Sequence, residues 1–283
     1  MSDARAATGP QPTSAETLPF RLIATDLDGT LLGPDHTVSA RTRAALTAAT
    51  SAGAAHIVVT GRTVPVARHI LDDLGYQGLA VCSQGAQLYH AGEHRLLTSV
   101  TLDRKVAVLA LEKIEAEVGP LAVAAARDGL DGEVLFGPGY RMGYDMELTS
   151  VTDPDEFWTA PLSKLYIQHP RLDDDALADA ALIAAGGLVG VTVAGTGLVE
   201  LLPLGLTKAT GLSLAARRLK ATAADTIAFG DMPNDIPMLE WARHGVAMAN
   251  AHDGLKAVAD EIAASNAEDG IAVVLERLFP ART

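Results

Sequence analysis

The sequence predicts an α/β fold: a Rossmann-like, doubly wound and mostly parallel sheet core with an inserted α+β cap domain. Near both ends of the chain, short apolar runs typical of buried strands alternate with amphipathic helical patterns. The middle of the chain instead mixes hairpin and helix patterns. With 283 residues the chain is long enough for two structural units.

The pattern of apolar residues predicts the strands and helices of the core. Buried strands are expected where a short run of apolar residues ends in a polar residue or glycine, at Leu22–Thr25, Ala55–Val59, Leu79–Cys82 and Thr226–Phe229. Helices are expected where apolar residues recur with helical spacing, at Ser39–Ala52, Val64–Leu74, Thr207–Leu219, Pro237–Ala242 and Ile271–Leu278. Strands that alternate with helices favour parallel pairing through right-handed crossovers.

The domain prediction places a disordered tail at residues 1–18, the core at 19–85 and 203–283, and the cap at 86–202. Within the cap, helices are expected around residues 105–118 and 174–185. The stretch from Ala180 to Val199 carries no charge and is as long as a membrane span. Its glycines and β-branched residues indicate instead a helix end, a Gly-Gly turn and a buried hairpin.

The composition narrows the possible partners and location. A formal net charge of −13 disfavours binding to nucleic acids and to anionic membrane surfaces. The single cysteine, Cys82, cannot form an internal disulfide, and the N-terminal residues lack the apolar core of a secretory signal. We therefore expect a cytoplasmic protein with no nucleic-acid or membrane partner.

Asp26 and Asp28 follow the first predicted strand, two positions apart, and Gly29 permits a sharp turn after them. Alternate strand residues share a face, so both carboxylates can point into the crevice at the end of the strand. Two carboxylates this close indicate either a divalent metal site or an acid–base couple. The alternative is an Asx-turn where the strand ends.

Other polar residues are expected at the same edge of the sheet. Thr60 and Gly61 follow the second strand and Lys208 begins a helix, where a lysine suits an anionic partner. Asp231 follows the fourth strand, at the position equivalent to Asp26, with Asn234 and Asp235 close behind. Each of these residues has an ordinary alternative when taken alone: Thr60 and Gly61 can form a simple turn, Lys208 can be solvated, and Asp235 can be an N-cap. Together they predict Mg²⁺ held by Asp26, Asp28 and Asp231, with Thr60 and Lys208 holding phosphoryl oxygens.

Several segments resemble the haloacid dehalogenase superfamily, in its large-capped Cof-type branch of phosphatases. They are DLDGTLL at 26–32, VTGR at 59–62, TKATGL at 207–212, GDMPND at 230–235 and GVAMANA at 245–251. The match covers both core segments, and the cap matches only in position and size. Relatives usually carry Asn where this chain has Gln84, and Gly where it has Ala209. Neither difference removes a catalytic group, so the two differences bear on the identity of the substrate and not on the type of reaction.

The resemblance implies roles for the matching residues. Asp26 is the implied nucleophile, and Asp28 the general acid and base, whose backbone carbonyl also binds the metal. The implied phosphate-binding residues are Thr60, Gly61, Lys208 and Asn234; Asp231 completes the metal shell, with Asp235 beside it. Candidate substrate contacts are Arg62, Ser83, Gln84 and Gly85, and in the cap Arg127, Asp128 and Lys164. The alternative for Arg62 is a surface ion pair, and the alternative for the three cap residues is a solvated face.

These roles predict a Mg²⁺-dependent phosphatase that hydrolyses a small phosphorylated metabolite, either a sugar phosphate or a phosphorylated cofactor, through an aspartyl-phosphate intermediate. We expect a monomer or homodimer. One alternative is a phosphotransferase or phosphomutase of the same superfamily, and another is a non-catalytic sensor of a phosphorylated ligand. A receiver-type signalling module is disfavoured, because a receiver needs no large insertion and no acid at Asp28.

Overall fold

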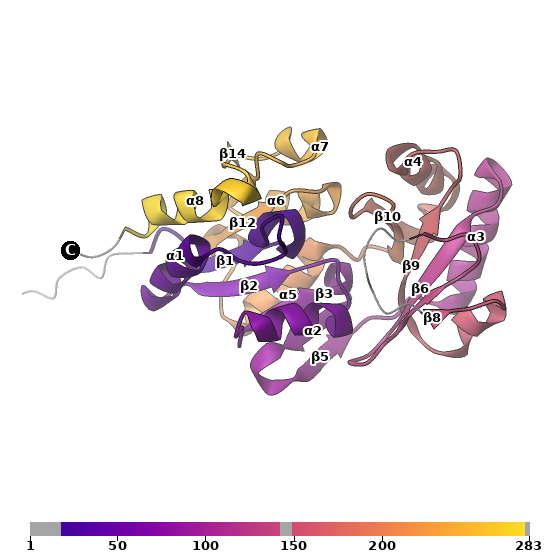
Figure 1. Ribbon diagram of the computed structural model, residues 1–283, viewed down its shortest axis with the longest axis horizontal. Coiled ribbons are helices and arrows are strands. Elements are labelled where there is room, and N and C mark those ends of the chain that lie inside the picture. Colours follow the sequence, from indigo (N-terminus) through magenta and orange to yellow (C-terminus); the bar gives the residue numbers. More distant parts are fainter. Residues whose placement is uncertain (1–17, 142–148, 281–283) are drawn as a thin grey trace, which may run out of the picture.

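The computed structural model describes residues 18–141 and 149–280, and it contains two sheets that lie side by side (Figure 1). The predicted N-terminal tail lies outside the described residues, apart from Leu18. We call residues 18–99 and 208–280 the first unit, and residues 104–203, which contain the smaller sheet, the second unit. Short 3₁₀ turns join elements at Ser83–Gly85, Ala91–Glu93, Pro154–Thr159, Ala223–Asp225, Pro233–Asp235 and Asn266–Glu268.

The sheet of the first unit has eight strands, in the order β14-β13-β12-β1-β2-β3-β4-β5. The parallel strands are β1 (Leu22–Thr25), β2 (Ala55–Val59), β3 (Leu79–Cys82), β12 (Thr226–Gly230), β13 (His244–Ala247) and β14 (Glu261–Ile262). Two antiparallel strands, β4 (Gln87–His90) and β5 (Arg95–Ser99), extend one edge. The predicted mostly parallel core and its four buried strands are confirmed, and β13 and β14 are additions.

Helices cover both faces of this sheet, because successive strand residues send their side chains to opposite faces. On one face, Ile23 and Val58 pack with α1 (Ala40–Ser51), α2 (Val64–Asp73) and α8 (Gly270–Leu278). On the other, Leu22 and Ala24 pack with α5 (Lys208–Arg218), α6 (Ile236–Trp241) and the short α7 (Asp253–Lys256). The result is the doubly wound, three-layer arrangement that the sequence predicts.

The sheet of the second unit has six strands, in the order β10-β11-β9-β6-β7-β8. They are β6 (Ala122–Arg127), β7 (Val134–Phe136), β8 (Thr149–Ser150), β9 (Leu162–Gln168), β10 (Val189–Val193) and β11 (Val199–Pro203). Helices α3 (Arg104–Val118) and α4 (Asp174–Ala185) cover one face and enclose an apolar core there. The other face carries a smaller apolar cluster and lies toward the first unit (Figure 1).

Strands β4 and β5 lie within the region that the sequence analysis assigns to the cap, yet β4 pairs with β3 in the first sheet. A strand's pairing partner depends on tertiary packing, so a hairpin pattern alone does not assign it to a sheet. We propose that the boundary of the inserted domain lies near residue 100 and not at residue 86.

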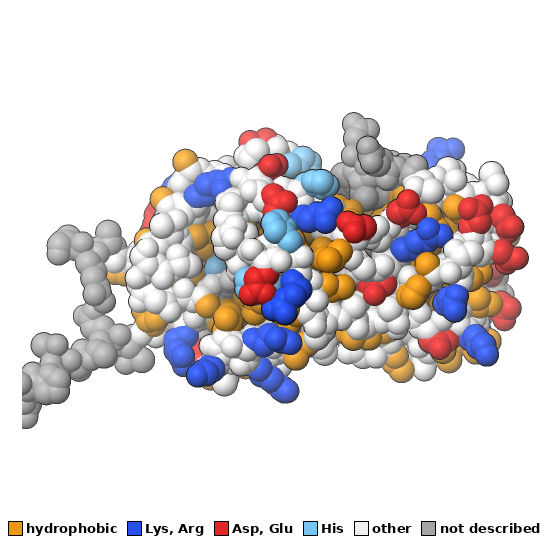
Figure 2. Space-filling view, turned by 90° about the horizontal axis from the view of Figure 1, so that it is seen from below, with side chains coloured by type: hydrophobic (Ala, Val, Ile, Leu, Met, Phe, Trp, Pro, Cys, Tyr) orange, Lys and Arg blue, Asp and Glu red, His pale blue; other side chains and the backbone are white. Residues whose placement is uncertain are grey.

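The uncharged stretch from Ala180 to Val199 forms the end of α4, a turn and β10, as predicted. None of the helices in the described part of the chain combines the length and apolar character needed to span a bilayer. Figure 2 shows that basic and acidic side chains intermingle over the lower face of the molecule, and that acidic side chains gather at the end formed by the second unit.

Candidate active site

The candidate site lies at the edge of the first sheet where β1 and β12 end. These parallel strands are neighbours, with Thr25 opposite Phe229, and the Asp26 amide donates to the Phe229 carbonyl oxygen at 3.0 Å. Asp26 and Asp231 each follow the end of their strand. The structure therefore brings these two carboxylates together, as their equivalent strand-end positions predict.

Three buried carboxylates form an acidic cluster here. One oxygen each from Asp26, Asp231 and Asp235 lies within 4.8 Å of the others. The Thr30 hydroxyl donates to Asp231 at 2.8 Å, and the amides of Asp231 and Met232 donate to Asp235 Oδ2 at 3.0 and 3.1 Å. These contacts orient the cluster, and its donor set consists of oxygens, which Mg²⁺ prefers.

Lys208 is the one ammonium group found inside this cluster among the described residues. Thr207 caps α5 by accepting from the Thr210 amide, which makes Lys208 the first residue of the helix. Its Nζ atom, almost fully buried, donates to Asp26 Oδ1 and to Asp235 Oδ1, both at 2.7 Å. Burial alone lowers the pKa of Lys208, but Asp235 and Asp26 outweigh it and raise that pKa above its usual value.

The cluster holds more negative charge than one lysine neutralises. Burial raises the pKa of Asp26 well above its usual value, against the opposing effect of Lys208. Burial and the nearby Asp235 raise the pKa of Asp231 to about 7. A divalent cation relieves both the burial cost and the mutual repulsion, so these residues fit a metal ion.

Asp28 lies apart from the cluster. Gly29 adopts φ +72°, and this turn directs the Asp28 carboxylate to Arg62. Arg62 donates from Nε to Oδ2 at 2.7 Å and from a terminal nitrogen to Oδ1 at 2.6 Å. Asp26, Asp28 and Arg62 line the same cavity, so both carboxylates border one space even though their direct partners differ.

The other predicted residues separate into two groups. Gly61 and Asn234 line the cavity. Thr60 is buried beside it, and its hydroxyl accepts from the Arg62 amide at 3.1 Å. Ser83 and Gly85 do not line the cavity: the Ser83 hydroxyl is buried without a hydrogen-bond partner among the described residues, and a Cβ on Gly85 would overlap the backbone of Thr207, the residue that caps α5.

Gln84 links the two units. Its amide nitrogen donates to Glu200 Oε2 at 2.7 Å, and its oxygen accepts from Asn234 at 3.1 Å. Glu200, on β11, also pairs with Lys164, on β9. Lys164 in turn donates to the Gly61 carbonyl oxygen at 2.6 Å, and both members of the ion pair are buried. The two units are therefore joined by a continuous polar network beside the cavity.

Sequence reasoning left Lys164 undecided and missed Glu200 and Tyr166. A signal was present, because Glu200 interrupts the apolar strand sequence VELL, and a charge at a buried strand position needs a partner or a function.

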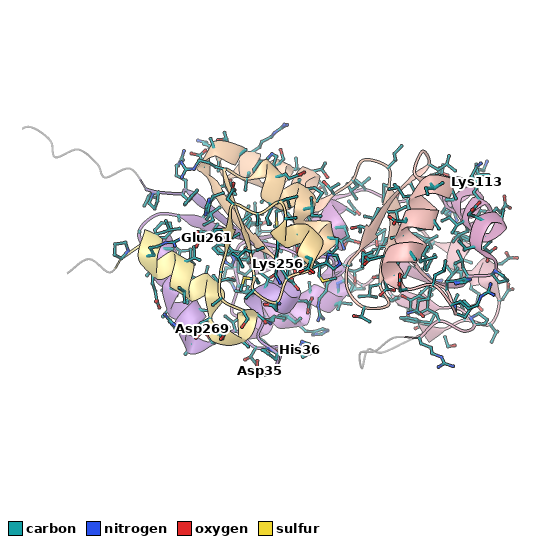
Figure 3. The ribbon with its side chains drawn as sticks, turned by 90° about the horizontal axis from the view of Figure 1, so that it is seen from above. Asp35, His36, Lys113, Lys256, Glu261 and Asp269 are labelled. Carbon is teal, nitrogen blue, oxygen red and sulfur yellow. The ribbon has the colours of Figure 1, made fainter. Side chains whose placement is uncertain are left out.

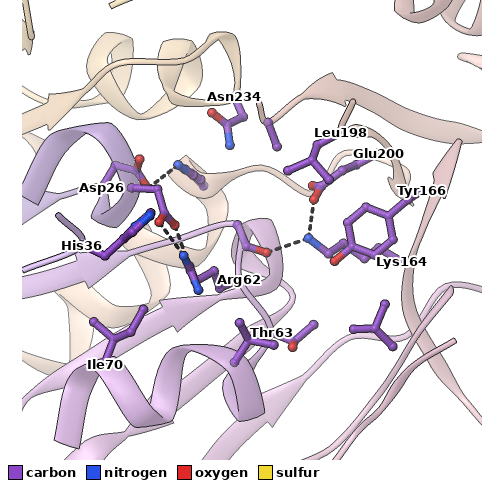
Figure 4. Close-up of a pocket in the computed structure, with 16 residues that line it drawn as sticks. Asp26, His36, Arg62, Thr63, Ile70, Lys164, Tyr166, Leu198, Glu200 and Asn234 are labelled. Carbon is purple, nitrogen blue, oxygen red and sulfur yellow. Dashed lines mark hydrogen bonds and ion pairs between the residues drawn. The ribbon is translucent and has the colours of Figure 1, made fainter. Parts of the chain in front are cut away.

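The cavity between the units has a volume of about 510 Å³. Figure 4 shows Asp26, Arg62 and His36 on the side of the first unit, and Lys164, Tyr166, Glu200 and Leu198 facing them from the second. A phosphorylated molecule of modest size can therefore contact the acidic cluster and the second sheet at the same time.

Comparison with known proteins agrees with this architecture. An HMP-PP phosphatase from Serratia proteamaculans is 28% identical over 255 residues, covering 86% of this chain and 89% of that protein. The 5-amino-6-(5-phospho-D-ribitylamino)uracil phosphatase YcsE from Bacillus subtilis is 25% identical, covering 87% and 91%. The crystal structure of SMU.1108c from Streptococcus mutans shares the fold, with a TM-score of 0.81 at 22% identity over 93% and 100% of the two chains. Residues 23–275 match the model for haloacid dehalogenase-like hydrolases, and the chain belongs to that family.

Proposed function

We propose that this protein is a Mg²⁺-dependent phosphatase that hydrolyses a small phosphorylated metabolite, a sugar phosphate or a phosphorylated cofactor, through an aspartyl-phosphate. The observation that carries the proposal is the setting of Asp26. Its carboxylate contacts Lys208, belongs to the acidic cluster and borders a cavity that also holds Asp28 and Arg62. The phosphatases from Serratia and Bacillus support it by family membership.

In the first step the Asp26 carboxylate attacks phosphorus and the bond from phosphorus to the leaving oxygen breaks. This produces an acyl phosphate on Asp26 and the alcohol. In the second step water attacks the same phosphorus, which releases inorganic phosphate and restores the carboxylate. Lys208 neutralises part of the charge on Asp26 and on the transferring group in both steps.

Asp28 is the proposed acid for the leaving oxygen and the base for the water. In the structure its carboxylate accepts both hydrogen bonds from Arg62. A bound phosphoryl group offers Arg62 a second anionic partner, and Asp28 can then turn toward the leaving oxygen. We assign the remaining phosphoryl contacts to Thr60, Gly61 and Asn234.

The residues that would hold Mg²⁺ are Asp26, Asp231 and the backbone carbonyl of Asp28, with Asp235 beside them. When bound, the ion supplies positive charge that offsets the phosphoryl oxygens and the acidic cluster. The second unit covers the site and limits the access of water. We further propose a cytoplasmic location and a monomeric or homodimeric state.

The test is phosphate release from a panel of sugar phosphates, nucleotides, pyridoxal 5′-phosphate and flavin mononucleotide, with Mg²⁺ or with chelator. Asp26→Asn preserves the size of the side chain and removes the nucleophile, so we expect a loss of at least about 10³-fold. Release that persists in Asp26→Asn or in chelator would contradict the proposal. Transfer of phosphate to an added acceptor sugar, in place of release, would indicate a phosphotransferase.

A further inference from the structure

The face of the second sheet that borders the cavity is built from adjacent strands. Tyr166 on β9 lies directly opposite Glu200 on β11 and Ala124 on β6. Lys164, two residues before Tyr166, shares its face and lies opposite Ala126. This face therefore places the Tyr166 ring and one buried ion pair beside small apolar residues, and Tyr166 is the aromatic residue of this face that lines the cavity.

The walls of the cavity away from the acidic cluster are largely apolar. The apolar side chains that form them are Val66 and Ile70 from α2, Val134 from β7, Tyr166 from β9, and Ala194 and Leu198 from the turn between β10 and β11; the polar residues His36 and Thr63 also line the cavity. Tyr166 and Val134 belong to one apolar cluster, and Leu198 packs against it. A leaving group that enters this half of the cavity meets mainly carbon atoms and the Tyr166 ring, with the hydroxyls of Tyr166 and Thr63 as uncharged polar groups.

The buried ion pair in this half already has partners, whereas the Thr63 hydroxyl, which also lines the cavity, is buried without a hydrogen-bond partner among the described residues. Lys164 contacts Glu200 and the Gly61 carbonyl oxygen, and its Nζ atom lies 4.7 Å from the centre of the Tyr166 ring. Glu200 also accepts from Gln84. A polyhydroxylated leaving group would bury several hydroxyls with few partners, and each unpartnered hydroxyl costs binding free energy. A planar ring carrying one or two polar atoms needs only the Lys164–Glu200 pair.

We propose that this half of the cavity selects phosphate esters whose leaving group is a planar aromatic or heteroaromatic ring over esters of polyhydroxylated sugars. This inference rests on the proposed phosphatase function and specifies its substrate class. Tyr166, Leu198 and Val134 contact the ring, while Lys164 and Glu200 contact its polar atoms.

The test compares kcat/KM for pyridoxal 5′-phosphate and benzyl phosphate with that for glucose 6-phosphate. All three are esters of primary alcohols, so their intrinsic leaving-group chemistry is similar. We expect kcat/KM for the ring esters to exceed that for glucose 6-phosphate by about tenfold or more. This is the size of one aromatic contact together with the cost of burying unpartnered sugar hydroxyls, which the ring esters do not incur. Equal values, or a preference for glucose 6-phosphate, would overturn the inference.

Variants locate the source of the selectivity. Tyr166→Leu should lower the ratio of ring-ester to sugar-ester kcat/KM by about tenfold, and Leu198→Asn, at a partly exposed position, provides a second test if the first variant does not fold. Trp158→Leu is the matched control, because it removes an aromatic ring that packs in the other core of the second unit. An unchanged ratio in both cavity variants would contradict the assignment.

A binding measurement separates this inference from the proposed function. Calorimetry on Asp26→Asn should show tighter binding of pyridoxal 5′-phosphate than of glucose 6-phosphate, whether or not the wild type releases phosphate. If the wild type releases no phosphate but Asp26→Asn still binds pyridoxal 5′-phosphate more tightly, the phosphatase proposal fails and the proposed ligand class is supported. Equal affinities would reject the ligand class, even if phosphate is released.

Discussion

Arg62 and Asp28 form a two-pronged ion pair in the lining of the cavity, with nitrogen–oxygen distances of 2.7 and 2.6 Å. Arg62 follows β2 and Asp28 follows β1, so the pair spans two neighbouring strand ends. A guanidinium that binds both carboxylate oxygens fixes the orientation of the carboxylate as well as its position. Arg62 is therefore a positioning residue for the proposed acid.

Arg62→Met should slow hydrolysis of alkyl phosphates more than hydrolysis of p-nitrophenyl phosphate, because an activated leaving group needs no proton from Asp28. We expect a loss of about 10²-fold for the alkyl ester, with partial recovery in Arg62→Lys. Arg68→Met, which removes an exposed ion pair with Asp131, is the control. Equal losses for both esters would show that Arg62 acts on the phosphate alone.

Lys208→Met should reduce both activity and stability. The substitution leaves Asp26 and Asp235 buried without their shared cation, and breaking a buried ion pair costs about 3–5 kcal/mol. Urea unfolding measures this loss, and added Mg²⁺ should recover part of it. Lys113→Met is the control, since Lys113 is exposed at the outer end of the second unit (Figure 3). Equal stability of the two variants would contradict the description of the cluster.

Gly29→Ala should perturb the acidic cluster directly. A Cβ at this position would overlap the Asp231 carboxylate, and the backbone has φ +72°. Gly75→Ala is a matched control because Gly75 has φ +63° and open space around it, so it carries only the backbone strain of about 1 kcal/mol. We expect Gly29→Ala to be the less stable of the two and to weaken the stabilisation by Mg²⁺ in thermal unfolding. A similar response to Mg²⁺ in both variants would count against a metal site at Asp231.

His56 should make the protein less stable as the pH falls. Its ring lies 2.8 Å from the Thr25 hydroxyl, and burial lowers its pKa to about 4. The unfolded chain, with its ordinary histidine pKa of about 6.5, binds the proton more readily, so stability is lost between these two values as pH decreases.

Because the His56 residue is only half-buried, solvent weakens this effect. We expect the free energy of unfolding to fall by about 1–2 kcal/mol over this range. Comparison of the free energy of unfolding of the wild type with that of His56→Gln at several pH values isolates the contribution. An identical pH dependence in both proteins would show that His56 remains ordinary in the folded state.

Four strands of the first sheet, β1, β2, β3 and β12, were predictable because their signal is local. The strand predicted at Leu22–Thr25 is β1, and the helix predicted at Val64–Leu74 differs from α2 by one residue. The sequence HGVA of β13 is too short and mixed to show strand character by itself. The placement of β4 and β5 was not predictable either, because a hairpin carries no local record of which sheet it joins.

The sequence by itself determined that Asp26, Asp231 and Lys208 would meet, because the ends of parallel strands and the first turn of the next helix share one edge of a sheet. Only the tertiary structure decided how that edge is enclosed. Gln84 and Glu200 are separated by 116 positions, and their hydrogen bond exists because the second unit packs against the first. Backbone geometry sets where a strand ends, whereas a buried charge finds its partner only when two separately formed surfaces come together and exclude water.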